Sequence, residues 1–218
     1  NIEWMASQFK VTITGGDEDY RIQTLARSAN GKGTGWNNST QFIKIDGTNP
    51  SGAWTSPATP NVWTNKNVEL TFNPSDARSG VAAWSYLIST NNGASYGSRS
   101  GIIYGDVTKT FTLTSEGKIK FSSDVTDNVM NYNGDVSSQS YWIDKTAPTA
   151  NAAAASTTSW TNADVTISVS GASDALSGFD QISLPNGTST KSTSANQLVS
   201  ANGNYTFAIK DVAGNVTN

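Results

Sequence analysis

The strongest constraint on the fold of this chain is an internal repeat with a spacing of about 98 residues. WTNKNV at 63–68 recurs as WTNADV at 160–165, SDARSG at 75–80 recurs as SDALSG at 173–178, and IDGTNP at 45–50 recurs as IDKTAP at 143–148. A fourth pair begins at Glu116 (EGKIKFSSDVTDNV) and at Asn202 (NGNYTFAIKDVAGNV). A unit of this length is too long for a solenoid repeat and has the size of one β-sandwich domain.

Each repeat consists of short apolar and β-branched runs between clusters of Gly, Asn, Asp and Pro, a pattern typical of antiparallel strands. The runs are VELTF, WSYLIST, KTFTLT and KIKFSS in the first copy, and DVTISVS, DQISL and NYTFAIK in the second. We therefore expect an all-β fold of tandem immunoglobulin-like, Greek-key β-sandwiches.

The repeat phase sets the expected domain boundaries. Residues 47–146 form one sandwich, and residues 147–218 form a second that stops after KDVAGNV and so lacks its last strand. Residues 1–46 contain a strand-like FKVTITG at 9–15 but no WTN motif, which indicates a partial or rearranged module. The Pro of IDGTNP and of IDKTAP ends a strand ladder, so these motifs mark the junctions between modules.

The composition excludes several classes of function. The chain has no Cys and no His, which removes disulfides, thiolate chemistry, Ser-His-Asp hydrolysis and histidine-ligated zinc. The net charge of -3 disfavours nucleic acid and anionic lipids as partners, and no segment has the length of a membrane-spanning helix. The few Glu residues build no recognisable cleft for glycoside hydrolysis, so we expect no enzyme activity.

The recurring Asp residues have two interpretations. Asp76 and Asp174 lie in turns where an Asp side chain can accept backbone N–H bonds, which is a structural role. In a Greek-key sandwich the loops after the second and sixth strands meet at one end, so these residues can also approach the turn that follows the sixth strand. The candidate calcium ligands are then Asp76, Asp124, Asp127, Asp174, Asp211 and Asn215.

The seven Trp residues also allow two interpretations, core packing or stacking on sugars. Trp63 and Trp160 recur in phase and are expected to cover one end of each sandwich, and Trp84 lies in a core strand. Trp36 and Trp142 have no partner in the repeat and are the candidates for glycan contact.

The motifs I-D-x-T-x-P, W-T-N-x-x-V, D-A-x-S-G and G-x-Y-x-F-x-x-K-D-x-A-G-N-V together resemble the bacterial immunoglobulin-like repeats of large surface and secreted proteins, mainly of Gram-positive bacteria. The resemblance covers residues 45–218. The turn SDVTDNV in the first copy departs from the usual KDxAGNV.

This resemblance implies a non-catalytic extracellular role, as a stalk, spacer, adhesin or S-layer lattice element at the bacterial surface. The expected partners are other modules of the chain, further copies in a lattice, or a glycan or protein of the host or cell wall, with calcium as the one expected ion. The alternatives are a carbohydrate-binding region of a larger glycan-active enzyme or adhesin and, more remotely, a phage tail module.

Overall fold

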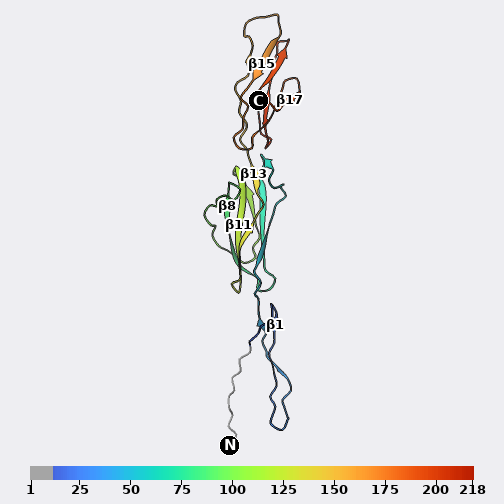
Figure 1. Ribbon diagram of the computed structural model, residues 1–218, viewed down its shortest axis with the longest axis vertical. Helices are drawn as coiled ribbons and strands as arrows, with labels where there is room; N and C mark the ends of the chain where they lie inside the picture. Colours follow the sequence, from blue (N-terminus) through green and yellow to red (C-terminus); the bar gives the residue numbers. More distant parts are fainter. Residues whose placement is uncertain (1–11) are drawn as a thin grey trace.

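The computed structural model describes residues 12–218, and these are all-β: they contain 20 short strands and no helix. The prediction of an all-β chain is confirmed. None of the described residues belongs to a helix of the length and apolar character needed to span a bilayer. Three parts follow one another along the long axis: an N-terminal hairpin, a middle unit and a C-terminal unit (Figure 1). Residues 1–11, which include Trp4 and the start of the expected 9–15 strand, lie outside the described residues.

The N-terminal hairpin (residues 17–44) is one antiparallel ribbon. β1 (Asp19–Tyr20) pairs with β4 (Ile43–Lys44), and β2 (Gln23–Thr24) pairs with β3 (Asn37–Asn38). No residue from 12 to 49 is buried, so this segment has no core of its own. Residues 12–15 of the expected strand are not in a strand.

The middle unit (residues 50–143) consists of two sheets. The first has the order β10-β7-β5, and the second has the order β6-β13-β11-β8-β9, with β12 also paired to β11. The strands are β5 (Ser51–Thr55), β6 (Trp63–Thr64), β7 (Val68–Ser75), β8 (Val81–Ser89), β9 (Ile103–Tyr104), β10 (Lys109–Leu113), β11 (Gly117–Asp127), β12 (Tyr132–Ser137) and β13 (Tyr141–Ile143).

The core of the middle unit follows from the period-2 pattern of its strands. In β7 the side chains of Val68, Leu70 and Phe72 are buried, whereas the residues between them are more exposed. They pack with buried residues of the other sheet, such as Phe121 and Trp84, so the two sheets enclose one apolar layer.

The C-terminal unit (residues 148–218) repeats this arrangement with shorter strands. Its sheets have the orders β14-β15-β18 and β17-β16-β19-β20. The strands are β14 (Ala154–Ala155), β15 (Val165–Val169), β16 (Phe179–Ser183), β17 (Ser189–Thr190), β18 (Ala195–Val199), β19 (Ala208–Asp211) and β20 (Val216–Thr217). β20 pairs with β19 as the start of β12 pairs with β11, but no strand within residues 148–218 corresponds to β13.

Candidate functional site

The two IDxTxP motifs form two junctions with matching contacts. We call residues 46–48 the first junction, between the hairpin and the middle unit, and residues 144–146 the second junction, between the middle and C-terminal units. Each junction is followed by a fully buried proline, Pro50 or Pro148. Because the two junctions have the same phase in the repeat, equivalent residues make equivalent contacts at both.

At the second junction, Asp144 holds the chain against the C-terminal unit. Its Oδ2 accepts a hydrogen bond from the backbone N–H of Ser177 at 2.9 Å, and its Oδ1 accepts one from that of Thr146 at 3.0 Å. Nδ2 of Asn215 donates to the carbonyl oxygens of Asp144 and Thr146 at 2.9 and 3.1 Å, and to Oδ2 of Asp211 at 2.7 Å. Asp144 and Asp211 are fully buried, so their carboxylates are satisfied by these hydrogen bonds and not by water.

The first junction repeats these bonds one period earlier. Oδ2 of Asp46 accepts from the N–H of Ser79 at 2.9 Å, and Oδ1 accepts from that of Thr48 at 3.1 Å. Nδ2 of Asn131 donates to the carbonyl oxygens of Asp46 and Thr48 at 3.1 and 3.2 Å, and to Oδ2 of Asp127 at 2.7 Å.

The second junction is also bound from the side of the middle unit. The backbone N–H of Asp144 donates to the carbonyl oxygen of Thr64 at 3.0 Å. Oε1 of Glu116, in the turn before β11, accepts from the N–H of Lys145 at 2.7 Å and from Oγ1 of Thr146 at 2.9 Å. Residues 144–146 therefore contact the units on both sides of them, which restricts bending at the junction.

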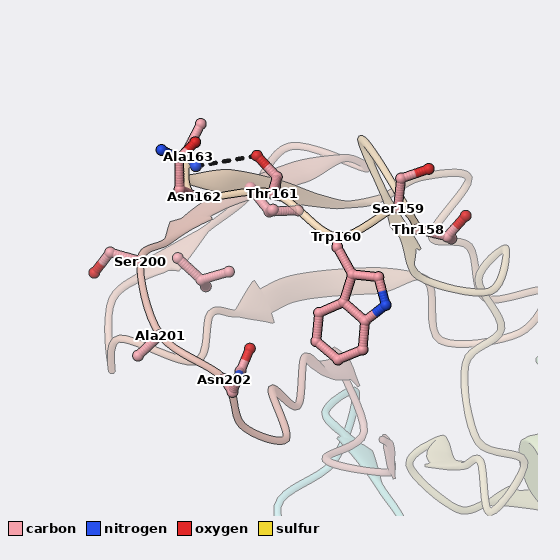
Figure 2. A pocket seen from close by; sticks show the side chains of 11 residues that line it. Thr158, Ser159, Trp160, Thr161, Asn162, Ala163, Ser200, Ala201 and Asn202 are labelled. Carbon is pink, nitrogen blue, oxygen red and sulfur yellow. Dashed lines mark hydrogen bonds between the residues drawn. The ribbon is translucent and has the colours of Figure 1, made fainter.

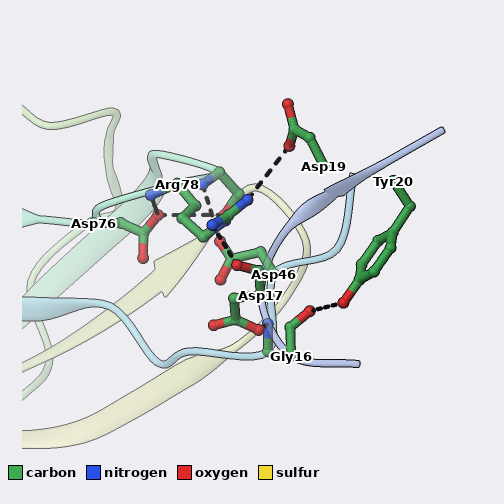
Figure 3. A network of polar contacts seen from close by, with 9 residues as sticks. Gly16, Asp17, Asp19, Tyr20, Asp46, Asp76 and Arg78 are labelled. Carbon is green, nitrogen blue, oxygen red and sulfur yellow. Dashed lines mark hydrogen bonds and ion pairs between the residues drawn. The ribbon is translucent and has the colours of Figure 1, made fainter. Parts of the chain in front are cut away.

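In the N-terminal hairpin, Asp17 accepts hydrogen bonds from the first junction as Glu116 does from the second. Its carboxylate accepts from the N–H of Gly47 at 2.6 Å and from the hydroxyl of Thr48. The guanidinium of Arg78 donates to the carbonyl oxygen of Asp17 and pairs with Asp19 at 3.3 Å (Figure 3). The hairpin is thus attached to the middle unit as the middle unit is attached to the C-terminal unit. Each junction has one cation: Arg78 at the first, and at the second Lys145, whose Nζ donates to Oδ1 of Asn67 at 2.6 Å.

The loop Asp of each unit faces the junction Asp. Oδ1 of Asp174 accepts from the N–H groups of Leu176 and Gly178 at 3.0 and 2.7 Å, and Asp76 makes the matching bonds. Gly178 and Gly80 close these turns with φ values of 90° and 79°, a region that disfavours side chains. The structural interpretation of the recurring Asp residues, as turn-fixing acceptors, therefore describes these loops.

Each junction gathers three carboxylates, each of which has an oxygen within 4.8 Å of the other two. The first cluster is Asp46, Asp76 and Asp127, and the second is Asp144, Asp174 and Asp211. Among residues 12–218 no Lys or Arg forms an ion pair with any of the six. Their negative charge is balanced by N–H donors instead.

Hydrogen bonding keeps part of each cluster ionised. Bonds from the side chain of Ser79 and from backbone N–H groups hold the pKa of Asp46 below its ordinary value of 3.8. Burial raises the pKa of Asp174, but the bonds from Gly178 and its two preceding residues outweigh this and leave that pKa below 3.8 as well.

Four of the predicted metal ligands, Asp76, Asp127, Asp174 and Asp211, therefore lie in the clusters, whereas Asp124 does not. Asp124 is wrong as a cluster member: it lies on the other face of β11, where it pairs with Arg99 and accepts from Oγ of Ser85 at 2.5 Å. Asn215 lies at the second cluster, where its Nδ2 donates to Oδ2 of Asp211; its role as a ligand through Oδ1 stays a prediction.

The motifs alone do not predict Asp46 and Asp144 as cluster members, because IDxTxP indicates only a strand end and a module junction. One sequence feature does connect them to the loop Asp residues: the separation from Asp46 to Asp76 is the same as that from Asp144 to Asp174.

The candidate glycan residues differ from each other. Trp36 lies in the hairpin and is 67% exposed. Trp142 packs against Trp63 with ring centroids 5.5 Å apart, and Nζ of Lys118 lies 4.3 Å from the centroid of the Trp142 ring. The face of Trp142 that a sugar would use is thus shared with a cation.

The other tryptophans differ in burial. Trp84 is buried in the core of the middle unit as expected, and Trp54 packs between Phe72 and Phe121. The expectation that Trp160 covers one end of its sandwich is wrong: its side chain is 101% exposed.

The chemistry available at the junctions is hydrogen bonding and cation binding by carboxylate oxygens.

The chain matches no protein-family model, and a search of curated proteins also finds no match.

Proposed function

We propose that this chain is a non-catalytic structural element of an extracellular bacterial surface protein, in which tandem immunoglobulin-like modules act as a stalk, spacer or lattice element. The observation that carries the proposal is the repeated junction, in which the same Asp, Asn and acidic turn residue bind the chain from both sides. A spacer needs length and a defined angle between modules, and matched two-sided junctions supply both.

The strand order supports the immunoglobulin-like part of the proposal. One sheet of the middle unit has the order β10-β7-β5, and the other places β11 between β8 and β12. This order agrees with the two strand sets expected of a Greek-key sandwich, and the C-terminal unit has the same pairs. The N-terminal hairpin fits the end of a preceding module, because β1 and β4 pair as β11 and β13 do and lead into a junction of the same kind.

We further propose that calcium binds at the carboxylate clusters and stiffens the junctions. Three carboxylates within 4.8 Å of one another, with no Lys or Arg paired to them in residues 12–218, supply the hard oxygen ligands that Ca²⁺ prefers. Asp174 would hold the ion through Oδ2, which accepts no hydrogen bond from residues 12–218.

Small-angle X-ray scattering tests the spacer proposal. We expect a monomeric rod with the length of the three parts in series. Its scattering curve should not change over a range of protein concentrations. A scattering curve of a compact or widely bending particle would contradict it. Size-exclusion chromatography with and without Ca²⁺ separates a lattice element, which associates, from a stalk, which does not.

Carbohydrate binding is the second candidate, favoured by the exposure of Trp36. Pull-down on insoluble polysaccharides, with Trp36→Ala as the variant, tests it. Binding that is lost in this variant supports the candidate, whereas equal retention of both proteins, or of neither, contradicts a role for Trp36.

A further inference from the structure

The outer face of the β12-β11-β8-β9 sheet in the middle unit carries an exposed tyrosine at each side. Four cross-strand partners form one row: Tyr132 of β12, Thr126 of β11, Ala83 of β8 and Tyr104 of β9. Partners across strands share a face, and Trp84 beside Ala83 is buried in the core, so the row points outward. Tyr104 is 74% exposed and Tyr132 is 52% exposed.

A hollow of about 210 Å³ lies between the two tyrosines. Its lining includes Ala83, Ser85, Arg99, Ile102, Asp124 and Thr126. Ala83 and Thr126 are also the middle of the row, which places the hollow at its centre. The Cα atoms of Tyr104 and Tyr132 are three strand spacings apart, which is about 14 Å.

A polar network is built into this hollow. The hydroxyl of Ser85, a buried residue, donates to Oδ1 of Asp124 at 2.5 Å. Nη1 of Arg99 donates to Oγ of Ser85 at 2.8 Å and pairs with Oδ2 of Asp124. That oxygen also accepts from the hydroxyl of Tyr132 at 3.2 Å. The only charged residues that line the hollow are thus paired with each other, and the hollow carries no net charge.

The network leaves donors and an acceptor for a ligand. Nε and Nη2 of Arg99 donate to no group among residues 12–218. The Asp124 carboxylate has about four acceptor positions, and the bonds described above occupy three of them. A sugar hydroxyl can donate to a carboxylate and accept from a guanidinium at the same time. A paired Asp and Arg therefore match hydroxyl groups better than they match an ion.

The C-terminal unit forms a corresponding pair of sheets without this network, so the fold does not require it. In that unit Ser183 pairs with Ala208, at the positions where the middle unit pairs Ser85 with Asp124. A partly exposed ion pair also adds little to stability. The network in the middle unit is therefore better explained by a ligand than by folding.

A loop of the middle unit places Arg99 at the hollow. Residues 90–102 join β8 to β9, whereas the shorter segment 184–188 joins β16 to β17. The backbone N–H groups of Gly97 and Ser100 donate to carbonyl oxygens of β8 at 2.9 and 2.8 Å. These bonds fix the loop against β8 on both sides of Arg99, so the guanidinium is positioned before a ligand arrives.

We propose that this face of the middle unit binds a neutral oligosaccharide. The rings of Tyr104 and Tyr132 stack on the C–H faces of the sugars, and Arg99 and Asp124 bond to the hydroxyls of the sugar in the hollow. β8 and β11 are each paired on both sides, so the floor of the site offers no free backbone groups to an added protein strand. The site lies in a different unit from Trp36 and depends neither on the spacer role nor on calcium.

Binding of the intact protein to an array of immobilised neutral oligosaccharides, built from glucose, galactose, mannose, xylose or N-acetylglucosamine, tests the proposal. Tyr104→Ala should weaken binding to the best-bound glycan by roughly tenfold, whereas Tyr104→Phe, which keeps the ring, should bind as the unchanged protein does. Arg99→Lys keeps the charge but loses the planar fork, so it should also weaken binding. Both side chains lie outside the core, so these variants should retain the fold, which thermal melts check.

Trp160→Ala is the matched control for an exposed aromatic ring. Figure 2 shows the indole of Trp160 standing clear of the strands around it. The hollow beside it has about 450 Å³, but within the described part of the chain none of the residues that line it is charged. This variant should bind the same glycan as the unchanged protein does.

Three results would overturn the proposal. The first is that the protein binds no glycan of the array, or binds only acidic glycans added to it. The second is binding that Tyr104→Ala leaves unchanged, or that Trp36→Ala or Trp160→Ala removes. The third is self-association that Tyr104→Ala abolishes, because this would assign the face to a second copy. None of these results concerns the junctions, so the scattering experiment tests the spacer proposal separately.

Discussion

Oδ2 of Asp144 accepts a hydrogen bond from the backbone N–H of Ser177 at 2.9 Å, and this one bond joins the second junction to the loop of the C-terminal unit. The bond between Asp46 and Ser79 has the same length at the first junction. Replacement of Asp144 by Ala removes the buried carboxylate that accepts two hydrogen bonds, from the N–H groups of Ser177 and Thr146, at a cost of about 1–3 kcal/mol.

Chemical denaturation of Asp144→Ala should therefore show the C-terminal unit unfolding earlier than in the unchanged protein. Asp164→Ala is the matched control, because Asp164 is exposed and outside the cluster. Equal losses of stability in both variants would contradict a specific role for the junction Asp.

Acid should loosen the junctions. The folded-state pKa values of Asp46 and Asp174 are lowered, so the stability they contribute is fully present above the unfolded value, near 3.8, and is lost as pH falls through the lower folded values. Thermal melts between pH 6 and pH 2 should show a decline that begins below about pH 4. A stability that rises over this interval would refute the pKa assignment.

Calcium should raise the melting temperature of the chain through the two clusters. Asp174→Asn removes one charged ligand from the second cluster and should reduce the gain for the C-terminal unit, while the middle unit keeps its response. Melts in CaCl₂ and in NaCl of equal ionic strength separate binding from screening. An identical gain in both salts would rule out specific binding.

Truncation of Trp84 in the core should lower the stability of the protein far more than truncation of Trp36 in the hairpin. Trp84 is 2% exposed, so Trp84→Ala should cost about 3–5 kcal/mol of stability in the middle unit. Trp36→Ala, at a side chain that is 67% exposed, should change stability by less than about 0.5 kcal/mol. Denaturant midpoints compare the two, and similar losses would show that the hairpin is part of a larger core.

The repeat and the alternation in segments such as VELTF were enough to predict an all-β chain and to find four of the six clustered carboxylates. The different position of Asp124 follows from strand alternation. Residues three apart on a strand point to opposite faces, and burial in β11 alternates regularly from Ile119 to Asp127, so Asp124 and Asp127 cannot both face the cluster. The exposure of Trp160 could not be predicted from the sequence, because the WTN motif does not specify which neighbouring segment covers its tryptophan.

The most direct test of the rigid junction uses spin labels, for which a chain without Cys is well suited. Thr112→Cys in β10 and Asn196→Cys in β18 place one label on the exposed surface of each unit. Pulsed electron paramagnetic resonance should give one narrow distance distribution, which broadens when Asp144→Ala is added and stays narrow with Asp164→Ala. A broad distribution in the doubly labelled protein with Asp144 intact would contradict the account.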